Sequence, residues 1–114
     1  MSGVIPAKGI SKNAQRAFIN ASASGVTALV AAAGGARTRI RVLAVVLTTT
    51  AENTIKFRSA STDITPAFPF VALGGMVLPF NEHGWFECAA AEALNFSQTV
   101  ATPCAVHIVY CLVD

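Results

Sequence analysis

Charged residues are scarce in this chain of 114 residues. Lysine and arginine contribute 8 and aspartate and glutamate 6, together 12% of the sequence, whereas hydrophobic residues make up 54%. A lone domain of this size would have difficulty covering itself with so few charges, so we expect some of its apolar surface to be buried against another subunit. The net charge of +2 is too small to indicate generic nucleic-acid binding.

Long hydrophobic runs are also absent. The richest run, Ile40 to Leu47, is far shorter than the roughly 20 residues that a membrane-spanning helix needs, so we expect no membrane partner. Residues 1–18 lack the apolar core and the small-residue cleavage site of a secretory signal. We therefore expect the protein to be made in the cytoplasm of its host.

Residues that commonly carry chemistry are few. The cysteines, Cys88, Cys104 and Cys111, are odd in number and form no CxxC pair, which favours reduced, buried thiols over a disulfide framework or a zinc finger. The two histidines, His83 and His107, belong to no nucleophile elbow and do not form the closely spaced pair of cupin-type metal barrels. We therefore expect no enzymatic activity, no metal and no cofactor.

The sequence does contain a regular succession of short apolar runs separated by turn-forming residues. The runs are broken by Gly34-Gly35, Gly74-Gly75 and Asn81–Gly84, among others. This pattern predicts an all-β protein, an antiparallel β-sandwich or barrel of about eight strands. We assign residues 16–114 to this domain, and residues 1–15, which show no hydrophobic period, to an extended N-terminal arm.

Two β-hairpins are predicted. Within Gly74–Phe96, two apolar runs flank the turn formers Asn81–Gly84, and Thr54–Arg58 follows the longest run, Arg37–Thr50, after a short link. Helix is the alternative for two alanine-rich segments, Thr27–Ala33 and Cys88–Leu94. Both segments are too short to be stable helices without packing support, so strand or loop is favoured.

Alternation along the longest predicted strand places three arginines on one face, and from Leu43 onward both faces are apolar. The arginines form either a solvated strand edge that discourages aggregation or a salt-bridged contact with another subunit. Nucleic-acid contact is less favoured, because the aromatics Phe57, Trp85 and Phe96 are expected in the core. The candidate subunit-interface residues are Arg37, Arg39, Arg41, Leu43, Val45 and Leu47, with the face of Ala105–Val113 as an alternative.

The segments TRIRVLAVVLTTTAENTIKFRS, AFPFVALGGMVLPFNEHGWFECAAAEALNFS and VHIVYCLVD resemble a family of small virion proteins of tailed bacteriophages. The likeness covers Val26 to Asp114 and includes the Thr62-Asp63 loop, the segment Gly74–Asn81 and the GWF of Gly84–Phe86. The chain departs from the family pattern at Ala91, where a glycine is usual, so the conformation of that turn is open.

The resemblance implies a jelly-roll β-sandwich that assembles as a homotrimer and binds the major capsid protein on the outside of the head as a cement or decoration protein. On this hypothesis Lys8, Lys12 and Arg16 of the basic leader are the capsid-contact candidates. The alternative is a trimeric tip of a phage fibre or other virion appendage that binds a receptor or glycan. An exposed aromatic loop would favour that alternative.

Overall fold

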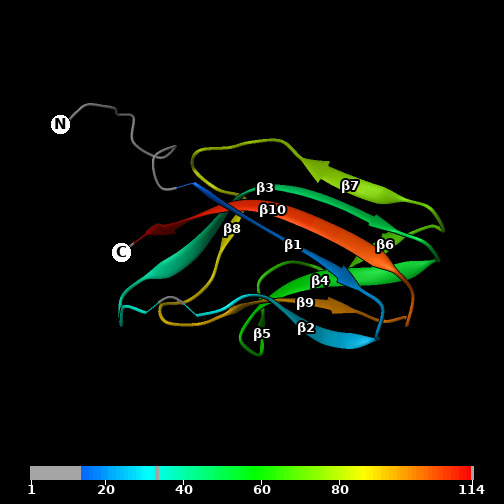
Figure 1. The fold of residues 1–114 in the computed structure, drawn as a ribbon, viewed down its shortest axis with the longest axis horizontal. Helices are drawn as coiled ribbons and strands as arrows, with labels where there is room; N and C mark the ends of the chain where they lie inside the picture. Colours follow the sequence, from blue (N-terminus) through cyan, green and yellow to red (C-terminus); the bar gives the residue numbers. More distant parts are fainter. Residues whose placement is uncertain (1–13, 33, 114) are drawn as a thin grey trace.

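The structure is a computed structural model that describes residues 14–32 and 34–113. These residues form β-strands and no helix (Figure 1). The strands are β1 (Gln15–Ala21), β2 (Gly25–Val30), β3 (Arg39–Thr49), β4 (Asn53–Ser59), β5 (Thr62–Asp63), β6 (Phe68–Phe70), β7 (Gly75–Leu78), β8 (Phe86–Glu87), β9 (Leu94–Gln98) and β10 (Cys104–Val113).

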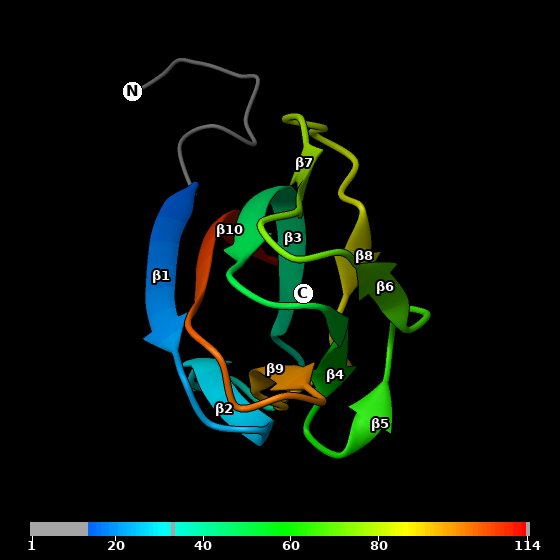
Figure 2. The same ribbon diagram turned by 90° about the vertical axis from the view of Figure 1, so that its right-hand side faces the viewer.

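The strands lie in two antiparallel sheets that face each other (Figure 2). Sheet I has the order β1-β10-β3-β7, with β8 also paired to β3, and sheet II has the order β2-β9-β4-β5, with β6 also paired to β4. Counting β5 with β6 and β7 with β8 as two interrupted strands gives eight strands, four in each sheet. This is the strand arrangement of a jelly roll, so the predicted all-β sandwich is confirmed.

Both predicted hairpins are wrong. β7 and β8 do not pair with each other, because each pairs with a different part of β3 and the two lie in line along its edge. β4 does not return beside β3 either, since it belongs to sheet II. Turn-forming residues mark where a strand ends, but they do not specify whether the chain returns in the same sheet or crosses to the opposite one. The alanine-rich segments contain no helix in their described residues.

The interior between the sheets is apolar, and strict alternation places its residues. β4 and β9 both show every second side chain buried, as the sequence pattern predicts. The Phe57 ring lies 5.0 Å from Phe86 and 6.0 Å from Phe96, centroid to centroid, so an aromatic cluster joins sheet II to β8 of sheet I. The expected burial of Phe57 and Phe96 is therefore confirmed.

A β-bulge changes which side of β3 faces the core. Val42 pairs with Tyr110 and Ala44 pairs with Val109, so Leu43 is an extra residue without a partner on β10. Before the bulge the even-numbered Val42 is buried in the core, and after it the odd-numbered Val45 is. The sequence run that reads as apolar on both faces therefore contains a change of phase.

Polar side chains close one end of the interior. Asn53 donates from Nδ2 to Gln98 Oε1 at 2.7 Å and to Thr49 Oγ1 at 3.3 Å, which joins β4 and β9 of sheet II to β3 of sheet I. Gln98 Nε2 donates to the carbonyl oxygens of Ala23 and Thr102 at 3.0 and 3.3 Å. Both amides are almost fully buried, and their hydrogen bonds keep them from being unsatisfied there.

The turn in which the chain departs from the phage pattern has the backbone conformation that favours glycine. Ala91 has φ of 61°, in the left-handed region. Its N–H donates to the carbonyl oxygen of Thr38 at 2.9 Å, which fixes the turn against the segment before β3. The question that the sequence left open is therefore answered: alanine adopts the strained conformation.

The expected N-terminal arm, residues 1–15, lies largely outside the described residues, and Gln15 is the first residue of β1. In the part of the chain that is described, no helix has the length and apolar character needed to cross a membrane.

Candidate interaction surfaces

The outer face of sheet I carries an exposed apolar row. In register across four strands, β1 to β10 to β3 to β7, the row consists of Phe18, His107, Val46 and Val77. Phe18 is 70% exposed, and its ring stacks on His107 with centroids 6.1 Å apart. Large apolar side chains seldom form a continuous exposed row on a protein surface in contact with water, so this row marks a candidate interaction site.

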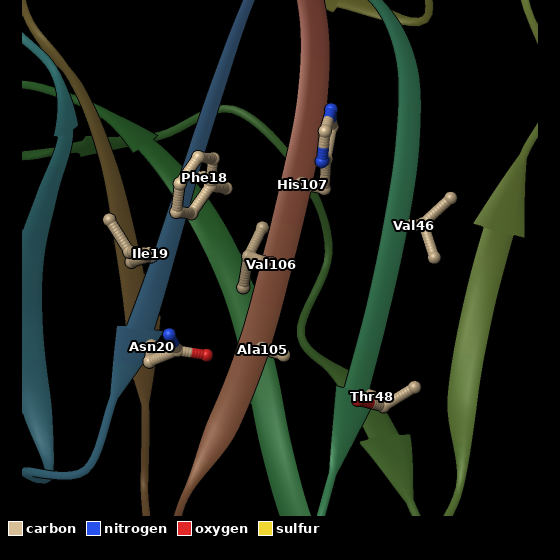
Figure 3. A pocket seen from close by; sticks show the side chains of 8 residues that line it. All are labelled: Phe18, Ile19, Asn20, Val46, Thr48, Ala105, Val106 and His107. Carbon is tan, nitrogen blue, oxygen red and sulfur yellow. The ribbon is translucent and has the colours of Figure 1, made fainter.

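A shallow hollow lies beside this row (Figure 3). The neighbouring row, again in register, is Asn20, Ala105 and Thr48, and the small side chain of Ala105 forms the floor between its larger neighbours. The hollow has a volume of about 250 Å³. We call the outer face formed by these two rows the apolar face; its residues are Phe18, Asn20, Val46, Thr48, Val77, Ala105 and His107.

The outer face of sheet II has the opposite character. Lys56 and Arg58 of β4 both bind Asp63 of β5, with Nζ and Nε each 3.0 Å from a carboxylate oxygen. Asn95 and Ser97 of β9 lie beside them in register. Apart from Val26 of β2, which is 51% exposed, this face is polar and ion-paired, as expected for a sheet surface in contact with water. An exposed row of large apolar side chains in register across the strands is therefore found on sheet I and not on sheet II.

The predicted arginine stripe is divided. Arg37 lies in the exposed turn before β3, whereas Arg39 and Arg41 lie on β3 beside Glu87 of β8. The Glu87 carboxylate is 2.8 Å from Arg41 Nε and 3.5 Å from Arg39 Nη1. Gly84, at φ of 84°, leaves space for the Arg41 side chain. Both strand arginines therefore find their acidic partner within the chain rather than in another subunit.

The aliphatic interface candidates are corrected by the structure. Leu43, Val45 and Leu47 are each buried within the single chain, with at most 1% of their surface exposed. Val45 and Leu47 belong to the core between the sheets, because the bulge at Leu43 turns the odd-numbered positions inward. These side chains have no surface left to contact a second subunit. The alternative face, that of Ala105–Val113, supplies Ala105 and His107 to the apolar face instead.

The capsid-contact candidates are only partly described. Lys8 and Lys12 lie outside the described residues. Arg16 is exposed on β1, and alternation puts it on the same face as Phe18. A cationic side chain therefore lies at the margin of the apolar face.

The residues considered for zinc are not brought together. In residues 14–32 and 34–113, no group of three or more His, Cys, Asp or Glu side chains could hold a metal ion. His83 lies on an exposed loop with Nε2 3.8 Å from Glu82, far along the chain from His107 on the apolar face. Burial raises the pKa of Cys88 to about 11, raises that of Cys104 to about 11, and also raises the pKa of Cys111. Thiols of this kind are poor ligands and poor nucleophiles.

A second exposed surface is the loop between β7 and β8. Its turn is formed by Asn81, whose side chain accepts from His83 N at 2.9 Å and whose carbonyl accepts from Gly84 N at 2.9 Å. Trp85 is 43% exposed, so its expected place in the core is wrong. Its indole N–H donates to the carbonyl oxygen of Pro79 at 2.7 Å, which holds the ring on the loop. Phe80, the next residue after Pro79, is 56% exposed.

Sequence reasoning did not identify Phe18, which is 70% exposed and more exposed than the two valines of the apolar row. It stands in a mixed polar and apolar segment, FINAS, with no strong period, and only the pairing of β1 to β10 places it beside His107. The sequence did contain one indication of this face: alternation along Cys104–Val113 puts Ala105 and His107 on the same side of the strand.

No known protein family matches the chain, and no curated protein sequence does. Solved structures with a detectable likeness include the crystal structure of ChmJ, a 3'-monoepimerase from Streptomyces bikiniensis in complex with dTDP-quinovose. The match has a TM-score of 0.31 and 8% identity, and it covers 83% of this chain and 44% of ChmJ. The chain thus spans less than half the length of that enzyme.

Proposed function

We propose that the chain is a structural virion protein, a trimeric cement or decoration protein that binds the outside of a tailed-phage head. The observation that carries the proposal is the contrast between the two outer faces. Sheet II presents ion pairs to water, whereas sheet I presents the apolar face. A protein that acts by assembly needs such a surface, and its function then depends on many weak contacts added over several subunits.

The resemblance to small phage virion proteins supports the capsid as the partner, and the jelly-roll strand order agrees with the fold that it implies. The proposed role is mechanical. The sandwich positions Arg16 on β1, and this arginine together with the leader residues Lys8 and Lys12 meets the capsid surface. No catalytic residue is assigned in this proposal.

Co-sedimentation with empty heads of the phage that encodes the chain tests this proposal. We expect the wild-type protein to sediment with the heads and Arg16→Glu to bind them more weakly, because the substitution reverses a cation beside the basic leader. Arg37→Glu is the matched control, since it reverses an arginine that is also exposed but lies in a turn distant in sequence from the leader. Wild-type protein that stays in the supernatant at all ratios of protein to heads would exclude the capsid role.

A receptor- or glycan-binding tip is a second candidate, and the exposed loop between β7 and β8 favours it. Phe80 and Trp85 present apolar rings next to the polar Asn81, which is a combination suited to stacking on a sugar and hydrogen bonding to its hydroxyls. Trp85 is the only tryptophan, so its fluorescence reports on this loop alone. A saturable change in emission with host-cell glycans, absent in Phe80→Ala, would support the second candidate over the first.

A further inference from the structure

We infer that the apolar face is the site at which a second copy of this chain docks, with Phe18 of one copy seated in the hollow over Ala105 of the next. The inference rests on the self-association included in the proposed function and does not depend on the capsid as partner. It replaces the aliphatic residues of β3 that the sequence suggested with a defined surface on β1, β3, β7 and β10.

The size of the face fits a protein partner. The outer face of sheet I, which contains the apolar face, is formed by β1, β10, β3 and β7, with 7, 10, 11 and 4 residues. With strands about 4.8 Å apart and a rise of about 3.3 Å per residue, it covers about 500 Å² in projection. Protruding side chains add accessible area, which brings the whole outer face of sheet I toward the roughly 800 Å² that each partner buries in a standard protein–protein interface. The hollow alone, at about 250 Å³, is smaller than the pockets that usually hold drug-sized ligands. The hollow is large enough to hold one side chain.

The shape of the face indicates that the partner is another copy. Phe18 projects from β1 as a knob that is 70% exposed, and the hollow lies immediately beside it on the same sheet. A surface that carries both a projection and a matching depression can pair with itself, either about a two-fold axis or around a ring. Fully buried aromatic anchors seated in pockets are also the residues that dominate interface energies.

The chemistry of the face is consistent with this packing. The centre of the face has no lysine, arginine, aspartate or glutamate, whereas charges lie at its margins, with Arg16 on one side and the Glu87 ion pairs on the other. Asn20 and Thr48 border the hollow with groups that can hydrogen bond across a contact. An apolar centre with a polar rim is the usual anatomy of a subunit interface.

The test is the solution mass of the full chain, by light scattering over a range of concentrations, for wild type and two matched lysine variants. Val46 and Val26 are strand valines of equal exposure, 48% and 51%, on the outer faces of sheet I and sheet II respectively. Val46→Lys should raise the dissociation constant at least about 100-fold, because association would bury an unpaired ammonium group. Val26→Lys should keep the wild-type mass. Equal circular dichroism for both variants shows that the fold is retained.

The Ala105→Phe variant distinguishes the proposed docking of Phe18 in the hollow from nonspecific hydrophobic association. If Phe18 enters the hollow, filling the hollow weakens association, even though the variant face is more hydrophobic. Stronger or unchanged association in Ala105→Phe would overturn the docking geometry.

The remaining outcomes distinguish this inference from the proposed function. Wild type that is monomeric at all concentrations refutes both. An oligomer that persists unchanged in Val46→Lys refutes only the assignment of the apolar face, and a dimer disrupted by Val46→Lys supports the face while contradicting the trimer. An oligomer that Val46→Lys disrupts but that ignores phage heads supports the face and removes the capsid role.

Discussion

Replacing Asn53 by alanine should be one of the most damaging polar substitutions in this protein. The amide joins the two sheets, because its Nδ2 donates to Gln98 Oε1 and Thr49 Oγ1, and its Oδ1 accepts from the backbone N–H groups of Thr54, Thr99 and Val100 at 2.9, 3.2 and 3.3 Å. No other side chain in the described part of the structure makes so many hydrogen bonds.

The magnitude follows from which partners water can reach. Thr99 and Val100 are exposed, so water replaces part of what their N–H groups lose. Gln98 is only 1% exposed, so its Oε1 would remain buried without a donor. An unsatisfied buried group costs about 1–3 kcal/mol, and with the smaller losses at Thr49 and Val100 we expect Asn53→Ala to lower the free energy of unfolding by about 2–4 kcal/mol.

The assay is urea unfolding followed by circular dichroism at one protein concentration, because any self-association would link stability to concentration. A loss of this size should lower the midpoint by roughly 1–2 M urea with little change in slope. Asn95→Ala is the matched control: its amide makes one hydrogen bond, to the carbonyl oxygen of Ala60 at 2.9 Å, on the outer face of sheet II. A loss for Asn53→Ala no greater than that for Asn95→Ala would refute the reasoning.

A double-mutant cycle tests the cause. If the unpaired Gln98 Oε1 causes much of the loss in free energy of unfolding, Asn53→Ala should produce a smaller loss in a Gln98→Ala background than in wild type. The oxygen that would be left unpaired is absent from that background. Additive losses would show instead that the two amides contribute independently.

Three further predictions concern the turn at Ala91 and the buried thiols. Ala91→Gly should raise the free energy of unfolding by up to about 1 kcal/mol, because glycine adopts the positive φ of this position without strain. Ala90→Gly, in the same turn, should lower the free energy of unfolding. A decrease in both variants would contradict the strain argument. Native Cys88 and Cys104, with thiol pKa values of about 11, should react with a disulfide reagent at pH 8 roughly 100-fold more slowly than free cysteine, and should react fully in urea. Because folding raises these two pKa values, the protonated thiols of Cys88 and Cys104 contribute to stability below about pH 9. This contribution is lost as the pH rises through about 11, so the urea midpoint should fall between pH 9 and pH 11.

The sequence was sufficient for the fold class and for much of the core. Alternation along β4 and β9 places Ile55, Phe57 and Phe96 on the inward side, and this period of two can be read from the sequence because it is a direct consequence of strand geometry. The arrangement of strands could not be predicted in the same way. Whether Asn53 begins a hairpin return or a strand of the other sheet depends on contacts between residues far apart in the chain, here those with Gln98 and Thr99.

The candidate interface shows the same limit at the level of single residues. Composition suggests that the chain has more apolar surface than one copy can bury, yet it does not say which residues carry the excess. In β3 the side chains of Val45 and Val46 look equivalent in sequence, and the unpaired Leu43 determines that Val45 is buried and Val46 exposed. Without the bulge the buried and exposed positions beyond it would exchange, and the row from Phe18 to Val77 would lose the valine at its centre. The position of this one extra residue therefore determines which surface is available to a partner, and the comparison of Val46→Lys with Val26→Lys measures its consequence directly.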